Sequence, residues 1–188
     1  MKRHERQKPQ LALWYERKAF TTGGGKATSH AKTKRIISTK QPIHLVMKSS
    51  LATGSRSLLK PQNRQAAERI LSRTASKFGV RVYRQVLMGN HIHMVIRVHN
   101  RQEFAKFLKS APSLIAQHIL RLKRGQKSEL LAVLKRGFWD ARPFTRVVSS
   151  WGQDYRRVLK YLARNLIQAY GFDGLDLWAG TEPMQWAG

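Results

Sequence analysis

Polar and apolar residues alternate along four short segments of the chain. Successive side chains of a strand point to opposite faces, so this alternation predicts strands over residues 41–48, 80–87, 91–98 and 144–149. The dipeptide Gly89-Asn90 lies between the second and third segments, and such a pair favours a tight hairpin turn. We therefore expect these two strands to pair antiparallel.

Apolar residues recur with helical spacing along three longer segments, which predicts helices over residues 64–78, 103–120 and 153–170. Gly79 and Gly171 should end the first and last helices, whereas Pro112 should kink or divide the middle one. Residues 121–137 are expected to form a mobile, basic connector. The order strand, helix, strand, strand, helix, strand is typical of an α+β ferredoxin-like split βαβ fold with an antiparallel sheet. The additional element is the C-terminal helix.

The C-terminal helix has an apolar stripe that should face the sheet, formed by Tyr155, Val158, Leu159, Leu162, Leu166 and Ala169. Tyr161 and Asn165 are four residues apart, so they lie together on one shoulder of this stripe. A phenol and an amide oxygen are thus presented side by side.

Composition excludes several classes of site. The chain has no cysteine, which excludes disulfide scaffolds, thiolate zinc sites and cysteine nucleophiles. No apolar run approaches the roughly 20 residues of a membrane span, so we expect no membrane partner and a cytoplasmic, nucleoid-associated protein. At 188 residues the chain predicts one central domain over 41–171, with a basic and flexible arm over 1–40 and an acidic tail over 172–188.

Charge points to a polyanionic partner. The 36 Lys and Arg residues against 10 Asp and Glu give a net charge of +26, which is the electrostatic footprint of nucleic-acid binding. The arm also carries Trp14, Tyr15 and Phe20, which either stack on bases or dock the arm on the domain. The cations expected to contact DNA are Arg17, Lys18, Lys32, Lys34, Arg35, Arg121, Lys123, Arg124, Arg146 and Arg157.

The most specific chemical signal is a pair of histidines on the third strand. His91 and His93 share one face, and the apolar residues between and after them share the other. Two neighbouring imidazoles form half of a metal site. If the shoulder of the last helix faces them, Asn165 completes a site for a divalent cation and Tyr161 is an oxygen nucleophile.

Each of these assignments has an alternative. The histidines could be an exposed pair, Asn165 could only cap or solvate its helix, and Tyr155 is a competing nucleophile that its place on the apolar stripe disfavours. His44 should lie on the same face as the pair, because the first and third strands are neighbours in this fold. There it would be either a further ligand or a packed histidine.

Two motifs resemble those of a known family. The His-hydrophobic-His signature at 91–93 and the Tyr-x-x-x-Asn pattern at 161–165 resemble the REP-associated tyrosine transposases, relatives of the single-tyrosine transposases in the HUH endonuclease superfamily. The Phe-Trp-Asp segment at 138–140 and the Pro-Phe-Thr-Arg-Val-Val segment at 143–148 look like two further blocks of that family. The resemblance covers the chain from about residue 42 to 172.

The resemblance implies a transposase-like single-stranded DNA endonuclease and strand transferase acting on hairpin, REP-like DNA as a monomer or homodimer. It implies Mg²⁺ or Mn²⁺ held by His91, His93 and Asn165, with Tyr161 forming a covalent 5′-phosphotyrosine. The alternative is a domesticated protein that binds hairpin DNA without cleaving it. A two-histidine RNA phosphoesterase would need a hydroxyl residue two places after His44 and His91, and a zinc hydrolase would need a His-Glu-x-x-His helix; the sequence has neither.

Overall fold

The computed structural model describes residues 21–22, 35–123, 125–133 and 135–170. Its elements in chain order are β1 (Thr21–Thr22), β2 (Ile43–Lys48), a 3₁₀ turn η2 (Gly54–Arg56), α2 (Pro61–Lys77), β3 (Arg81–Leu87), β4 (His91–Arg97), α3 (Arg101–Ile119), α4 (Glu129–Val133), β5 (Phe144–Val147) and α5 (Gln153–Tyr170). The four predicted strands and three predicted helices are all present, with ends that move by a few residues.

The strands form one sheet in the order β1-β5-β2-β4-β3, and every pair of neighbours is antiparallel. The first and third predicted strands, β2 and β4, are therefore adjacent, and the ferredoxin-like arrangement expected from the sequence is confirmed. The short strand β1 was not predicted. Its two threonines pair with Arg146 and Thr145 of β5, so part of the basic arm extends the sheet at one edge.

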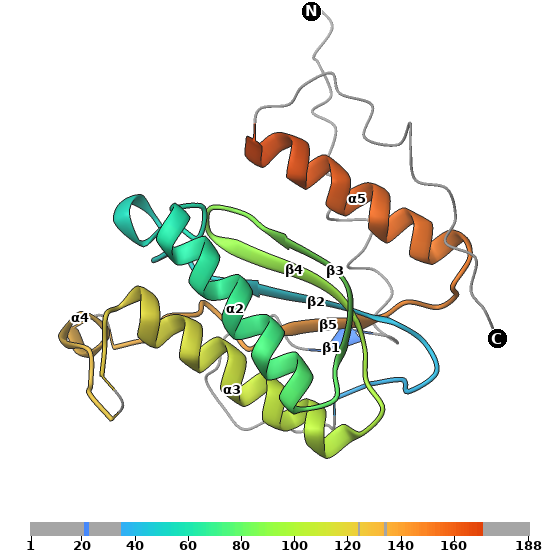
Figure 1. Ribbon diagram of the computed structural model, residues 1–188, viewed down its shortest axis with the longest axis horizontal. Coiled ribbons are helices and arrows are strands. Elements are labelled where there is room, and N and C mark those ends of the chain that lie inside the picture. Colours follow the sequence, from blue (N-terminus) through green and yellow to red (C-terminus); the bar gives the residue numbers. More distant parts are fainter. Residues whose placement is uncertain (1–20, 23–34, 124, 134, 171–188) are drawn as a thin grey trace, which may run out of the picture.

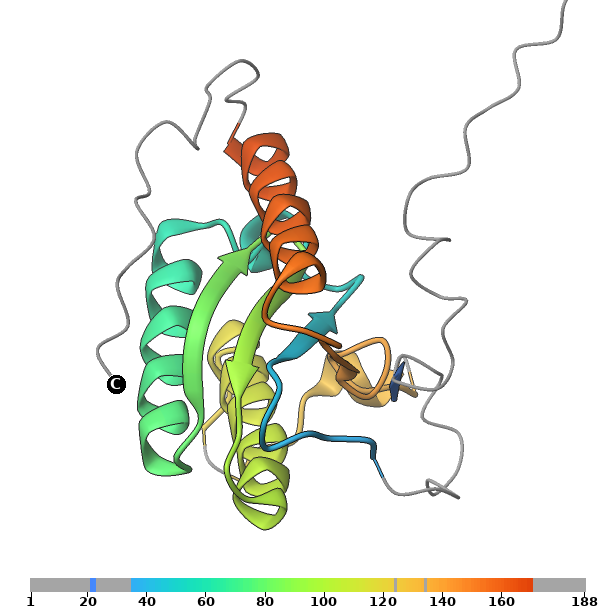
Figure 2. The same ribbon diagram turned by 90° about the vertical axis from the view of Figure 1, so that its right-hand side faces the viewer.

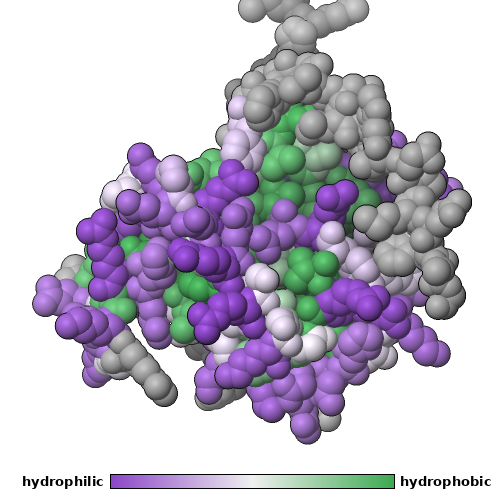
Figure 3. Space-filling view, viewed as in Figure 1, coloured by the Kyte–Doolittle hydropathy of each residue, from purple (hydrophilic) through white to green (hydrophobic). Residues whose placement is uncertain are grey.

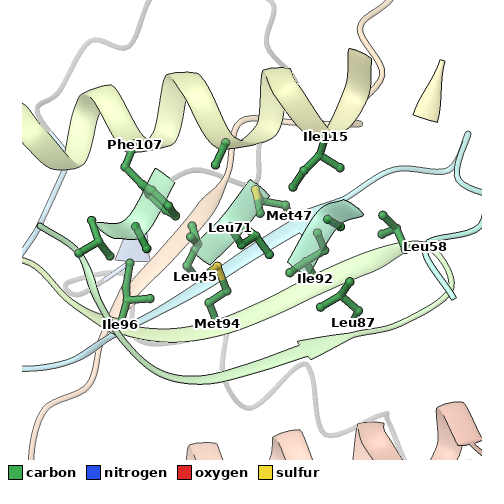
Figure 4. Close-up of a cluster of buried hydrophobic side chains, with 14 of the residues drawn as sticks. Leu45, Met47, Leu58, Leu71, Leu87, Ile92, Met94, Ile96, Phe107 and Ile115 are labelled. Atoms are coloured by element: carbon green, nitrogen blue, oxygen red, sulfur yellow. The ribbon is translucent and has the colours of Figure 1, made fainter. Parts of the chain in front are cut away.

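Helices α2 and α3 cover one face of the sheet, and α5 lies against the other (Figures 1 and 2). The larger core lies between the sheet and α2 and α3, where Ile92, Met94, Leu71 and Phe107 pack together (Figure 4). Fully burying one such side chain contributes about 1.5–3 kcal/mol. A smaller cluster on the opposite face joins Val95 of β4 to residues of α5. This second layer brings α5 next to the histidine strand.

Two details differ from the sequence prediction. Helix α3 continues through Pro112 without a division, although a proline inside a helix lacks one hydrogen-bond donor. Pro112 is buried, and its carbonyl accepts a hydrogen bond from Trp139 Nε1 at 2.9 Å, so this turn is tied to the core. The connector 121–137 also contains the short helix α4, which its weak apolar pattern did not predict.

The start of α5 is fixed by an ion pair and by aromatic packing. Arg146 of β5 contacts both carboxylate oxygens of Asp154, at 3.1 and 3.0 Å, and Ser149 donates to the same carboxylate from its backbone and its hydroxyl. Tyr155 packs with the rings of Tyr83 and Trp151, whose centroids are 6.4 and 5.3 Å away. These contacts set the position of the rest of the helix.

Across the described parts of the chain, none of the helices combines the length and the apolar character that crossing a membrane requires.

Candidate active site

The two histidines of β4 lie on the sheet face that α5 covers. Their ring centroids are 4.8 Å apart and their planes are at 88°. Ile92, Met94 and Ile96 point into the opposite core, so the predicted alternation along this strand is confirmed. His93 is 3% exposed, whereas His91, nearer the hairpin turn, is half-buried.

Helix α5 presents Tyr161 to this histidine face. Its residues Val158 and Leu162 are buried against Val95 of β4, and Tyr161 packs against the edge of the same cluster. The centroid of the Tyr161 ring is 5.4 Å from that of His93 and 6.1 Å from that of His44. The shoulder of α5 that carries the tyrosine therefore does face the histidines.

Asn165 lies on α5 one turn after Tyr161, and its side-chain Nδ2 donates to the Tyr161 carbonyl at 3.1 Å. This bond engages the amide nitrogen of Asn165, while the amide oxygen is the atom that a metal ion would use. Tyr155, the competing nucleophile, packs among aromatic rings instead. Burial raises the pKa of Tyr155 and neighbouring Tyr83 adds to the rise, against the opposing effect of Arg84.

His44 of β2 reaches the same face from the neighbouring strand. It is buried, and its Nε2 lies 3.2 Å from Nδ1 of His93. The structure thus brings together His44, His91, His93 and Tyr161 from three elements. The sequence placed His44 on the correct face, but its contact with a specific nitrogen of His93 depends on the register between β2 and β4.

Burial keeps these imidazoles neutral at pH 7. Desolvation, reinforced by the charge of Arg146 and opposed by Asp154, lowers the pKa of His44 to about 3. Desolvation, followed by His44 and His91, lowers the pKa of His93 well below its usual value. The pKa of His91 is lowered by desolvation and by Lys48. Neutral imidazole is the form that binds a metal ion.

Nε2 of His91 and Nε2 of His93 have the chemistry that a metal ligand requires. His91 Nδ1 lies 2.7 Å from the Asn90 side-chain oxygen, which accepts its hydrogen and leaves the Nε2 lone pair of His91 for a ligand. His93 Nε2 is buried without a hydrogen-bond partner, which is costly unless the atom is used. Within the described residues, no three or more His, Cys, Asp or Glu side chains are placed to hold a metal ion. The amide oxygen of Asn165 stays the further ligand that the sequence motif predicts.

The cations expected to contact DNA fall into three groups. Arg121, Lys123 and Arg157 are exposed. Arg35 and Arg146 have protein partners: Arg35 donates to Pro143 O and Thr145 Oγ1, and Arg146 is 8% exposed in its pair with Asp154. In this structure both guanidinium groups therefore bind other parts of the same chain. The others lie outside the described residues, as do the arm aromatics and the acidic tail: Arg17, Lys18, Lys32, Lys34 and Arg124.

The Arg146–Asp154 pair is a feature that the sequence analysis missed. An acidic side chain in the first turn of a helix interacts favourably with the positive end of the helix dipole. Asp154 occupies that position in α5. No local pattern indicates that its partner is an arginine on a strand eight residues earlier.

The structure combines a ferredoxin-like sheet, a histidine pair on that sheet and a tyrosine on the helix facing it. This combination is the one that the transposase-like sequence motifs predict. Residues 38–165 match the family model described as transposase, IS200-like. The match spans more than half of the chain, and the chain belongs to this family.

The comparison with solved structures concerns the fold alone. A REP-associated tyrosine transposase bound to a REP hairpin aligns with a TM-score of 0.54 and 14% identity, over 84% of this chain and 92% of that one. A candidate transposase from Deinococcus radiodurans R1 aligns with a TM-score of 0.41 and 15% identity, over 72% of this chain and 98% of that one. No relative is found among curated proteins. The transposase family expected from the sequence motifs is confirmed by the family match, and the fold is shared with the REP-associated tyrosine transposase.

Proposed function

We propose that this transposase cleaves and rejoins single-stranded DNA through a covalent bond between Tyr161 and a 5′-phosphate. The observation that carries the proposal is the position of the Tyr161 ring, whose centroid lies 5.4 Å from that of the His93 ring. The nucleophile from the helix layer lies beside His93, and His91 lies beside His93 on the same strand, which supports their action on one phosphate.

The substrate we propose is a DNA hairpin with an unpaired segment at the cleavage point. The similar solved structure is that of a protein bound to a REP hairpin, and this chain carries a net charge of +26. Figure 3 shows hydrophilic residues over most of the α2 and α3 side, while hydrophobic residues gather near α5. Lysine and arginine contacts to phosphates supply affinity that falls with salt and depends little on sequence.

His91, His93 and the amide oxygen of Asn165 would hold Mg²⁺ or Mn²⁺. Such a cation, when bound, would neutralise and orient the phosphodiester. The attack of Tyr161 on the phosphodiester needs no further reactant. The Tyr161 oxygen bonds to phosphorus, the bond from phosphorus to the 3′-oxygen breaks, and the phenol proton is matched by the proton that the 3′-hydroxyl gains. Because the energy of the phosphodiester is kept in the phosphotyrosine, a second 3′-hydroxyl can reverse the step on another strand.

The direct test is capture of the covalent intermediate. The protein is incubated with 5′- and 3′-labelled hairpin DNA and Mn²⁺, and the products are separated by denaturing electrophoresis. Wild-type protein should retain the label on the 3′ side of the break, which carries the 5′-phosphate, and Tyr161→Phe should form no adduct while binding DNA with unchanged affinity. Tyr155→Phe is the matched control on the same helix, and it should still form the adduct.

Two results would contradict the proposal. An adduct that persists in Tyr161→Phe would place the nucleophile elsewhere. Tight binding of several hairpins without any adduct, with either metal, would instead identify a hairpin-binding protein that does not cleave.

Sedimentation of the protein with and without the hairpin would separate the monomer from the homodimer.

A further inference from the structure

The contact between His44 and His93 has the geometry of a hydrogen bond between two imidazoles lying edge to edge. The nitrogen atoms are 3.2 Å apart, the ring centroids are 5.4 Å apart, and the planes differ by 18°. The distance between the ring centroids exceeds the distance between the nitrogens by about the width of one imidazole ring. The two nitrogens therefore lie close to the line that joins the ring centres, and each points directly at the other.

This arrangement is not that of two ligands converging on one ion. Ligands of a common metal direct their lone pairs to a third point at the side of the line between them. In His44 and His93 the facing nitrogens are directed at each other, so one of them must carry the hydrogen that the other accepts. The interpretation of His44 as a further metal ligand is therefore disfavoured by the geometry.

The direction of this hydrogen bond decides what the far side of His93 can do. If His44 donates, His93 has its own hydrogen on Nε2, which is buried and has no partner in the structure. If His44 accepts, the hydrogen of His93 is on Nδ1, and Nε2 has a free lone pair. A buried nitrogen with a lone pair is suited to bind a cation, whereas a buried N–H at the same place would exclude one.

We propose that His44 is a positioning residue, which accepts the Nδ1 hydrogen of His93 and thereby holds His93 in the tautomer whose Nε2 can bind a metal ion. Use of that lone pair by a metal rests on the proposed function. The hydrogen bond between the two rings does not rest on it, because their contact is present in the structure.

The accepting role is the one that leaves a lone pair on the buried Nε2 of His93, where the proposed cation would bind. His44 stands opposite Arg146 in the register between β2 and β5, and Arg146 is itself held by Asp154 at the start of α5. His44 is itself buried. A neutral ring is required, because a doubly protonated histidine has no acceptor. The ion pair of Asp154 with Arg146, the register between β2 and β5, and the contact of the two rings thus link α5 to the histidine pair.

The first test is the tautomer of His93 in metal-free protein. Long-range ¹H–¹⁵N correlation spectra distinguish protonated from unprotonated ring nitrogens, and a His93→Gln sample assigns the signals. Wild-type protein at pH 7 should show His93 with hydrogen on Nδ1 and none on Nε2. Hydrogen on Nε2 would overturn the proposal, whatever the catalytic activity of the protein.

The second test measures Mn²⁺ binding by calorimetry in four variants, of which His93→Gln removes a proposed ligand. His44→Leu removes the acceptor, and Mn²⁺ affinity should fall about tenfold to a hundredfold, the usual loss for a residue that orients a ligand. His44→Gln places an amide oxygen near the position of Nε2 and should keep the affinity within about threefold of wild type. His118→Leu, at an exposed histidine outside this cluster, is the control and should change nothing.

The outcomes separate the proposal from its alternatives. Unchanged affinity in His44→Leu would refute a positioning role. An equal and large loss in His44→Gln and His93→Gln would mean that His44 is itself a ligand. If His44→Leu does not fold, as judged by circular dichroism, His44→Gln and the wild-type spectra still decide the question. If wild-type protein binds no Mn²⁺ at all, the metal part of the proposed function fails, while the spectra still test the tautomer.

Discussion

Removing the carboxylate of Asp154 should destabilise the protein strongly, because this residue fixes α5 to the sheet. The side chains of Arg146 and Asp154 are only 9% and 14% exposed. The carboxylate accepts two hydrogen bonds from Arg146 and two from Ser149, at 2.7–3.1 Å. Asp154→Ala would leave the Arg146 guanidinium group without its anion in a largely buried site.

Breaking one partner of a buried ion pair costs about 3–5 kcal/mol. We expect about 3 kcal/mol for Asp154→Ala, because the carboxylate edge is partly open and water can occupy the space left. Asp154→Asn keeps the acceptor oxygen for Ser149 and should lose about 1.5 kcal/mol. Urea unfolding followed by tryptophan fluorescence measures both changes in the free energy of unfolding.

The chain provides a matched control in the pair Arg64–Glu68. This pair has a similar nitrogen–oxygen distance, 2.9 Å, but its side chains are 44% and 40% exposed. Glu68→Ala should therefore cost no more than about 0.5 kcal/mol. Equal losses for Asp154→Ala and Glu68→Ala, or a loss below about 1 kcal/mol for Asp154→Ala, would refute the reasoning from burial.

The same ion pair predicts a dependence on pH. Burial by itself would raise the pKa of Asp154, but hydrogen bonds from Arg146 and Ser149 and the charge of Arg146 outweigh burial and lower it. A lowered pKa in the folded state means that the stabilisation is complete above about pH 4, the unfolded value, and is lost as the pH falls through the folded value. The stability difference between wild type and Asp154→Asn should therefore shrink below about pH 4.

Three further predictions concern other parts of the fold, all measured by urea unfolding. Gly79→Ala should lower the free energy of unfolding by about 1 kcal/mol, because Gly79 has φ +58°. Gly89→Ala should change it by no more than about 0.5 kcal/mol, since its new Cβ would meet only Ser57 Oγ at 3.6 Å. Equal losses in the two variants would contradict this account. Because the folded pKa of His44 is lowered to about 3 from 6.5, stability should decline as the pH falls from 6.5 towards 3, and His44→Gln should flatten this decline. Phe107→Ala should cost about 3–5 kcal/mol, because Phe107 is fully buried between the sheet and the helices; a loss under 1 kcal/mol would show that the core relaxes around it.

The sequence by itself determined the three long helices, the four longer strands and the two faces of the site strand. Helix α5 has the predicted bounds 153–170, because the helical period of its apolar residues is a local property of the chain. The position of His91 and His93 on one face of β4 follows from the alternation of side chains in any strand. Tyr161 was likewise placed on the correct shoulder of its helix, since helix geometry fixes the angle between residues.

Only the tertiary structure decided which of these faces meet and which atoms touch. The contact between His44 and His93 depends on β2 and β4 being neighbours in a particular register. The Arg146–Asp154 pair and the addition of β1 at the sheet edge have the same origin. Even Pro112, a local signal for a break, is accommodated in α3 by burial and by a bond from Trp139. The physical reason is that hydrophobic period encodes which side of an element is buried, while strand order and register are set by packing between segments far apart in the chain.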